Sequence, residues 1–160
     1  MNNTAPLPHT RFAKYRAEVC SEDEVKQLVH TFYAAARDDA MLGPIFAAEV
    51  KDWDAHLATL VDFWSGLLRG TMRYHGKPLA QHAQMEHLTP CMFRRWLTLF
   101  FATTESMGNA ALQEKADTIA LNIAERLWKS FAESHASKCS PQQTAILTTP
   151  EKTVASGSCG

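Results

Sequence analysis

The sequence lacks any long hydrophobic run. No apolar stretch approaches the ~20 residues that a helix needs to cross a bilayer. The start of the chain has neither the charged nor the apolar region of a signal peptide. We therefore expect a cytoplasmic protein with no membrane partner.

An excess of charge of either sign is also missing. Sixteen basic side chains stand against seventeen acidic ones, which gives a formal net charge of -1. Binding to nucleic acid depends on clustered positive charge, and the overall balance offers none. We expect no nucleic-acid partner and look for partners in a pocket instead.

The four cysteines show no metal-binding spacing. Cys20, Cys91, Cys139 and Cys159 form no C-x-x-C pair, and an even count alone is poor evidence for disulfides. We therefore expect reduced thiols. The C-x-x-C-H sequence that attaches haem covalently is absent as well, so any haem would be held by ligation and burial.

The chain does contain enough apolar material for one core. Of its 160 residues, 46% are hydrophobic and 21% are charged, which is typical of a single globular domain. Residues 1–20 have no sustained apolar period, and residues 136–160 are rich in Ser, Thr, Pro and Gly. We expect a folded domain at 21–135 between a flexible N-terminal extension (1–20) and a disordered C-terminal tail (136–160).

Apolar residues recur at helical spacing through this domain. The capping-box pattern Ser21-Glu22-Asp23-Glu24 predicts a helix start, and the apolar period that follows ends near Arg37. A turn into a short helix is expected at residues 41–46. A second long helix is expected over residues 52–68, with Gly70 as its stop.

The second half of the domain contains a broken segment and two more helices. Residues 69–90 are punctuated by Gly and Pro, so we expect a mobile loop with one short helical piece around His82. Thr89-Pro90 is typical of a helix start and predicts a helix to about Met107. The last helix is expected to bury Leu112, Ala116, Ile119, Ile123, Leu127 and Phe131. No segment makes a comparable strand, so the predicted fold class is all-α.

His82 stands in the broken segment, where a short imperfect helix can tilt toward a flat cofactor. A neutral imidazole is a good ligand for iron. Spacing alone favours a surface histidine, because isolated histidines are common and His75 and His87 flank this one without any period. All three histidines remain candidates at this point.

Four ordered motifs resemble the third group of truncated haemoglobins, and the resemblance covers residues 21 to about 133. The motifs are residues 32–46 (FYAAARDDAMLGPIF), 53–66 (WDAHLATLVDFWSG), 76–82 (GKPLAQH) and 93–100 (FRRWLTLF). The resemblance implies a truncated globin-like two-on-two helical sandwich around haem b. It also implies that His82 is the proximal iron ligand.

The same resemblance implies a distal site of Tyr33, His56 and Trp96 that holds a bound ligand. Oxygen on ferrous haem gains negative character, so a phenol and an indole N–H aimed at it make charge-assisted hydrogen bonds. Apolar residues at helical spacing usually form the hydrophobic core, and less often line a cofactor pocket. The predicted haem-pocket walls are Phe32, Phe46, Leu60, Phe63, Trp64 and Phe93.

The function implied is reversible binding of oxygen and related diatomic ligands to haem b. Three polar groups around the distal site would retain oxygen firmly, so a haem redox enzyme is the alternative. Such an enzyme would detoxify nitric oxide, nitrite or peroxide and would need an external reductase. A haem-free helical module that binds a partner protein is the alternative of another class.

The chain departs from the family pattern after the proximal histidine. Many relatives have Pro and Gly where this sequence has Glu86-His87, which leaves His87 as a rival ligand. The Gly-Lys-Pro-Leu lead-in favours His82. Arg69, Arg73 and Lys77 could reach the haem propionates, although a solvated loop face is the simpler interpretation of each.

Overall fold

The computed structural model describes residues 19–85 and 87–135, and these residues form six helices and no strand. The helices are α2 (Glu22–Asp38), α3 (Gly43–Glu49), α4 (Trp53–Arg69), α5 (Pro78–Ala83), α6 (Pro90–Ser106) and α7 (Ala110–Ser134). The all-α prediction is confirmed. The predicted tails lie outside the described residues, except for Val19 and Cys20.

Local capping explains why the long helices begin where the sequence predicts. At α2 the Ser21 hydroxyl accepts from the Glu24 N–H at 3.1 Å, and the Glu24 carboxylate accepts from the Ser21 N–H at 2.7 Å. Asp52 caps α4 by accepting from the Ala55 N–H at 3.0 Å. Gly70, with φ of 77°, ends α4 in the left-handed conformation that favours glycine.

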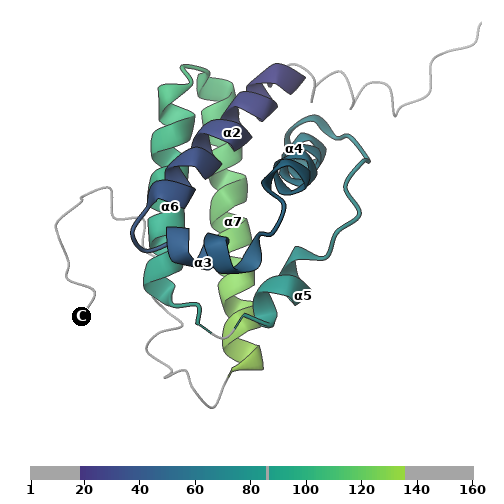
Figure 1. Ribbon diagram of the computed structural model, residues 1–160. Helices are drawn as coiled ribbons and strands as arrows, with labels where there is room; N and C mark the ends of the chain where they lie inside the picture. Colours follow the sequence, from purple (N-terminus) through teal and green to yellow (C-terminus); the bar gives the residue numbers. More distant parts are fainter. Residues whose placement is uncertain (1–18, 86, 136–160) are drawn as a thin grey trace, which may run out of the picture.

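The long helices form two pairs, as expected of a two-on-two sandwich. Figure 1 shows α6 and α7 side by side, with α2 lying across them and α4 seen almost end-on. Helix α2 packs against both α4 and α6, and α7 contacts α4, α5 and α6. The short helices α3 and α5 lie at the same end of the molecule (Figure 1).

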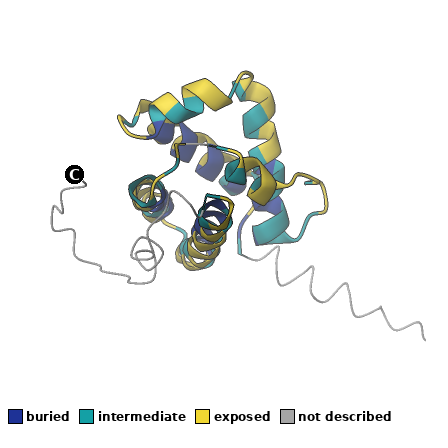
Figure 2. Ribbon diagram, turned by 90° about the horizontal axis from the view of Figure 1, so that it is seen from below, coloured by how far each residue is buried: buried dark blue, intermediate teal, exposed yellow. Residues whose placement is uncertain are grey.

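Buried residues gather where the helices face one another (Figure 2). The largest fully buried side chains include Leu28, Phe32, Trp64, Leu68, Phe100 and Leu112. Three of the aromatic rings form a stack: Phe100 lies between Trp96 and Trp64, at centroid distances of 5.2 and 4.8 Å. Aromatic packing therefore joins α4 to α6 through the centre of the fold.

The buried face of α7 differs in part from the predicted one. Leu112, Ala116, Leu127 and Phe131 are buried, but Ile119 and Ile123 are only half-buried. The buried row continues instead through Ala120, Ala124 and Trp128. Alanine allows neighbouring helices to approach closely, so the small side chains, and not the isoleucines, face the centre of the bundle.

One buried polar contact joins α6 to α7. The hydroxyl of Thr104, which is fully buried, donates to the Asp117 carboxylate at 2.7 Å. Burial raises the pKa of Asp117, and the hydrogen bond from Thr104 opposes that rise. Asp117 therefore holds its proton more firmly than an exposed aspartate does.

An ion cluster ties the end of α4 to the start of α2. The Glu22 carboxylate binds Arg69, and its other oxygen binds Arg73 at 2.6 Å. Arg73 also reaches Asp62 at 2.8 Å. The hydrogen bond from Arg73 lowers the pKa of Glu22 below its ordinary value, although burial opposes this shift.

The cysteines follow the prediction in part. Cys20 is a buried free thiol, as expected. Cys91 is disulfide-bonded, so the reduced-thiol interpretation is wrong for this residue. Disulfides join residues that the fold brings together, and spacing along the sequence does not reveal them. Cys139 and Cys159 lie outside the described residues.

The helices in the described part of the chain were also compared with the length and hydrophobicity that a membrane span needs. None of them meets both requirements.

Candidate functional site

A cavity of about 800 Å³ is lined by residues of all six described helices. Every residue predicted for the site lines it, with the exception of Phe32. The lining residues from that set are Tyr33, Phe46, His56, Leu60, Phe63, Trp64, His82, Phe93 and Trp96. A volume of this size suits a cofactor, so the cavity is the candidate site.

Tyr33 comes from α2 and is 6% exposed. Burial raises the pKa of its phenol, so the hydroxyl keeps its proton at neutral pH. The indole of Trp96 partly opposes that rise, as an N–H donor directed at the Tyr33 oxygen does. Such a donor uses only an acceptor position of the phenol, so the Tyr33 O–H is still free to donate to a ligand in the cavity.

His56 comes from α4 and lies beside Tyr33. The two rings are perpendicular, with centroids 5.9 Å apart. Burial lowers the pKa of His56 below its ordinary value, with a smaller contribution in the same direction from His82. The imidazole is therefore neutral at pH 7 and carries one N–H donor and one acceptor nitrogen.

His82 lies on α5, the short helix that packs against α7. Its Nδ1 is 2.8 Å from the carbonyl oxygen of Pro78. A carbonyl only accepts, so Nδ1 carries the proton and Nε2 keeps a free lone pair. A backbone carbonyl that accepts from one ring nitrogen is the usual arrangement around a metal-ligating histidine.

These residues fit a haem. The lining is largely aromatic and aliphatic, which suits a flat apolar macrocycle. His82 presents a lone pair that would suit an iron ligand, and Tyr33 places a hydroxyl donor in the same cavity. The rival histidines His75 and His87 are both exposed, and neither lines the cavity.

Phe32 is the predicted wall that the structure places elsewhere. It is 1% exposed and does not line the cavity. Its ring packs edge-to-face against Trp96 and Phe100, at 5.3 and 5.2 Å between centroids. Successive residues of an α-helix point about 100° apart. Tyr33 therefore faces the cavity while Phe32 packs behind it.

Several lining residues were not predicted: Leu42, Ile45, Tyr74, Met92 and Ile123. The half-buried Ile123 belongs to the apolar stripe predicted for the last helix, and Met92 directly precedes Phe93, a predicted pocket wall. The sequence therefore offered a reason to include both residues. It offered none for Tyr74. Its ring lies 5.0 Å from that of Phe63, and its hydroxyl sits where a side chain at Gly76 would be.

The three cations considered for the haem propionates, Arg69, Arg73 and Lys77, do not line the cavity. Arg69 and Arg73 each bind the Glu22 carboxylate, as described above. Lys77 is exposed at the residue before α5. The described structure therefore favours a solvated or ion-paired role for these three cations.

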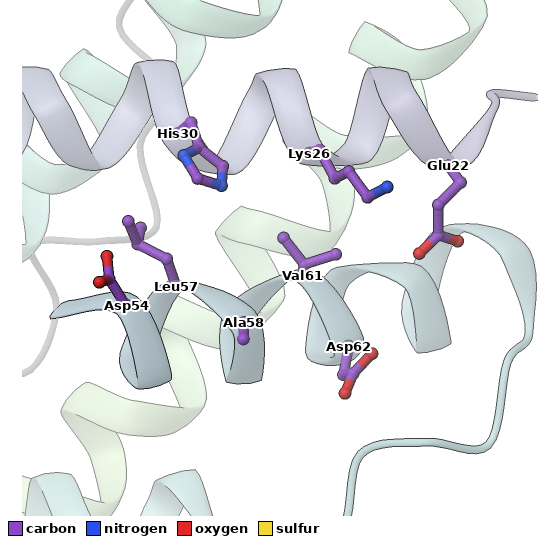
Figure 3. A pocket seen from close by; sticks show the side chains of 8 residues that line it. All are labelled: Glu22, Lys26, His30, Asp54, Leu57, Ala58, Val61 and Asp62. Carbon is purple, nitrogen blue, oxygen red and sulfur yellow. The ribbon is translucent and has the colours of Figure 1, made fainter. Parts of the chain in front are cut away.

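A second cavity, of about 470 Å³, lies between α2 and α4. Figure 3 shows His30 and Lys26 reaching from α2 toward Leu57, Ala58 and Val61 of α4. None of the predicted site residues lines it, and its Glu22 is already bound to two arginines. It is not the candidate site.

Comparison with known proteins gives one consistent result. The family described as Bacterial-like globin matches residues 17–131. The "Group 3 truncated hemoglobin ctb" of Campylobacter jejuni is 32% identical over 121 residues, which cover 70% of this chain and 94% of that protein. The crystal structure of group III truncated hemoglobin from Campylobacter jejuni has a TM-score of 0.67 at 28% identity, covering 71% of this chain and 93% of that one.

Proposed function

The chain belongs to the bacterial-like globin family, and from that premise we propose that it binds oxygen and related diatomic ligands reversibly at the cavity described above. Globins carry haem, usually haem b, and bind diatomic ligands such as oxygen. In this proposal His82 is the proximal ligand, and Tyr33, His56 and Trp96 form the distal site.

The observation that carries the proposal is the hydrogen bond between His82 and Pro78. This hydrogen bond leaves Nε2 of His82 with a free lone pair in the large apolar cavity. Neither His75 nor His87 has this combination of a cavity position and a fixed tautomer. His82 is therefore the best supported ligand.

Ferrous haem, when bound, supplies the reversible coordination of a diatomic molecule. Tyr33 would donate a hydrogen bond from its hydroxyl to that molecule, and the Trp96 N–H, directed at the Tyr33 oxygen, would hold the hydroxyl in place. His56, neutral and half-buried, supplies one further N–H. Phe46, together with the other aromatic walls, excludes water, which strengthens each of these hydrogen bonds.

Replacement of the proposed ligand tests the proposal. We expect His82→Ala to lose haem readily and to change the absorption spectrum of the ferrous protein. His75→Ala is the matched control, because this exposed histidine lies in the same segment and does not line the cavity. Normal haem retention and an unchanged ferrous spectrum in His82→Ala would move the assignment to another histidine.

A redox role is the second candidate, and the position of His56 favours it. This histidine lines the cavity yet is only half-buried, so it can pass a proton between solvent and a distal substrate. Turnover of nitric oxide, nitrite or peroxide also needs electrons from an external reductase. Turnover with a chemical reductant that is no faster than that of free haem would leave binding as the function.

A further inference from the structure

Trp53 lies directly behind the distal site without belonging to the cavity lining. It is the first residue of α4, three residues before His56. Its ring is perpendicular to that of His56, with centroids 5.6 Å apart, and lies 6.5 Å from that of Tyr33. Trp53 therefore contacts two of the proposed distal residues from outside the cavity.

Trp53 is itself covered by a cation. The guanidinium carbon of Arg37 lies 4.2 Å from the centre of the Trp53 ring. Arg37 stands in the last turn of α2, four residues after Tyr33, so the two side chains share one face of that helix. This cation–π contact joins the end of α2 to the start of α4.

Ring packing is what orients His56. Within the described part of the chain no hydrogen bond holds its imidazole, whereas the ring meets Tyr33 on one side and Trp53 on another. Both contacts are edge-to-face, the favoured geometry for aromatic pairs. Loss of either neighbour frees the imidazole to adopt other rotamers.

We propose that Trp53, held in place by Arg37, is a positioning residue that keeps His56 turned into the distal site. Trp53 does not touch the ligand, and it acts only through His56. The inference rests on the proposed function, because it matters only if His56 faces the bound ligand.

Carbon monoxide bound to the ferrous holoprotein is the probe. The C–O stretching bands report how many orientations His56 adopts, and flash photolysis gives the rebinding rates. An aromatic pair of this kind changes an equilibrium by roughly two- to tenfold, and an exposed cation–π contact by about two- to fivefold. The variants are Trp53→Leu, Trp53→Phe and Arg37→Gln. Arg126→Gln is the control, because Arg126 is exposed on α7.

We expect Trp53→Leu to shift the band populations by roughly two- to tenfold, Arg37→Gln by less, and Trp53→Phe least of the three, because it keeps a ring. Arg126→Gln should leave the bands unchanged. In a His56→Ala background, Trp53→Leu should have no further effect, since the residue it acts through is gone.

Two outcomes separate this inference from the proposed function. Bands that change in His56→Ala but not in Trp53→Leu would overturn the positioning role alone. Bands that do not change in His56→Ala would overturn the distal role of His56 itself. A Trp53→Leu effect that persists in the His56→Ala background would show a general structural change and would also overturn the inference.

Discussion

The indole of Trp96 partly opposes the rise in the pKa of the Tyr33 phenol, so the two side chains interact inside the cavity. The two residues come from α6 and α2, and both line the large cavity. We infer that the two proposed distal donors act one through the other: the Trp96 N–H acts on the Tyr33 oxygen, and the Tyr33 O–H acts on the ligand. In the proposed site the Tyr33 O–H would be directed at the ligand, and Trp96 would support the tyrosine oxygen.

The first prediction concerns Tyr33. We expect Tyr33→Phe to raise the oxygen dissociation rate by about tenfold to a hundredfold, since a hydrogen bond to a ligand with negative character contributes about 1.5–3 kcal/mol. Stopped-flow measurement of oxygen release gives the rate. Thr31→Val is a control on the same helix, at an exposed position. A Tyr33→Phe rate equal to that of the parent would remove the donor role.

The second prediction concerns Trp96. Trp96→Phe should also speed oxygen release, but by a smaller factor than Tyr33→Phe, because we infer that its N–H acts through the tyrosine hydroxyl. Effects in the double variant should be less than additive, as is usual for residues in direct contact. Fully additive changes in the logarithm of the rate would mean that the two residues act independently.

The third prediction concerns the pH dependence of stability. Burial raises the pKa of Asp117, so the folded state binds this proton more tightly than the unfolded state does. The stabilisation is complete below the ordinary aspartate pKa of about 3.9 and is lost as pH rises through the raised value.

Asp117→Asn should therefore gain stability relative to the parent as pH rises, while its amide oxygen still accepts from Thr104. Urea unfolding of both proteins between about pH 4 and pH 7 measures the difference. A difference that does not vary with pH would show that Asp117 has the same pKa in both states.

The fourth prediction concerns the ion cluster at the start of α2. Glu22→Gln removes the charge that binds Arg69 and Arg73, and we expect it to lower the free energy of unfolding by about 1 kcal/mol. The neighbouring Asp23→Asn is the matched control. Asp23 pairs with Lys26 at 3.6 Å but is 93% exposed, so its loss should be close to neutral. Equal effects in the two variants would contradict a special role for Glu22.

The helix boundaries could be predicted because capping is local. Ser21 with Glu24, Asp52 before α4 and Thr89 with Pro90 before α6 each act on amides within three residues of themselves. The patterns are therefore visible in the sequence without knowledge of the fold. The helix around His82 was predictable for the same reason, since Pro78 suits a first turn.

The direction in which each side chain points was harder to predict, because it depends on packing partners that are distant in the sequence. Phe32 and Tyr33 are adjacent and both aromatic, and only the placement of α6 decides which one meets the cavity. Likewise, α7 carries an isoleucine stripe beside an alanine stripe, and packing against the neighbouring helices buries the alanines. The support of Tyr33 by Trp96 is another such contact between distant residues.

The hydrogen-bond partner of His82 lies four residues earlier on the same six-residue helix. The imidazole and the carbonyl that sets its tautomer consequently move as one rigid body. A displacement of α5 would carry the imidazole and this carbonyl together, without exchanging the protonated nitrogen. The segments on either side of α5 can thus differ in sequence, as Glu86-His87 does, while the chemistry of this nitrogen stays the same.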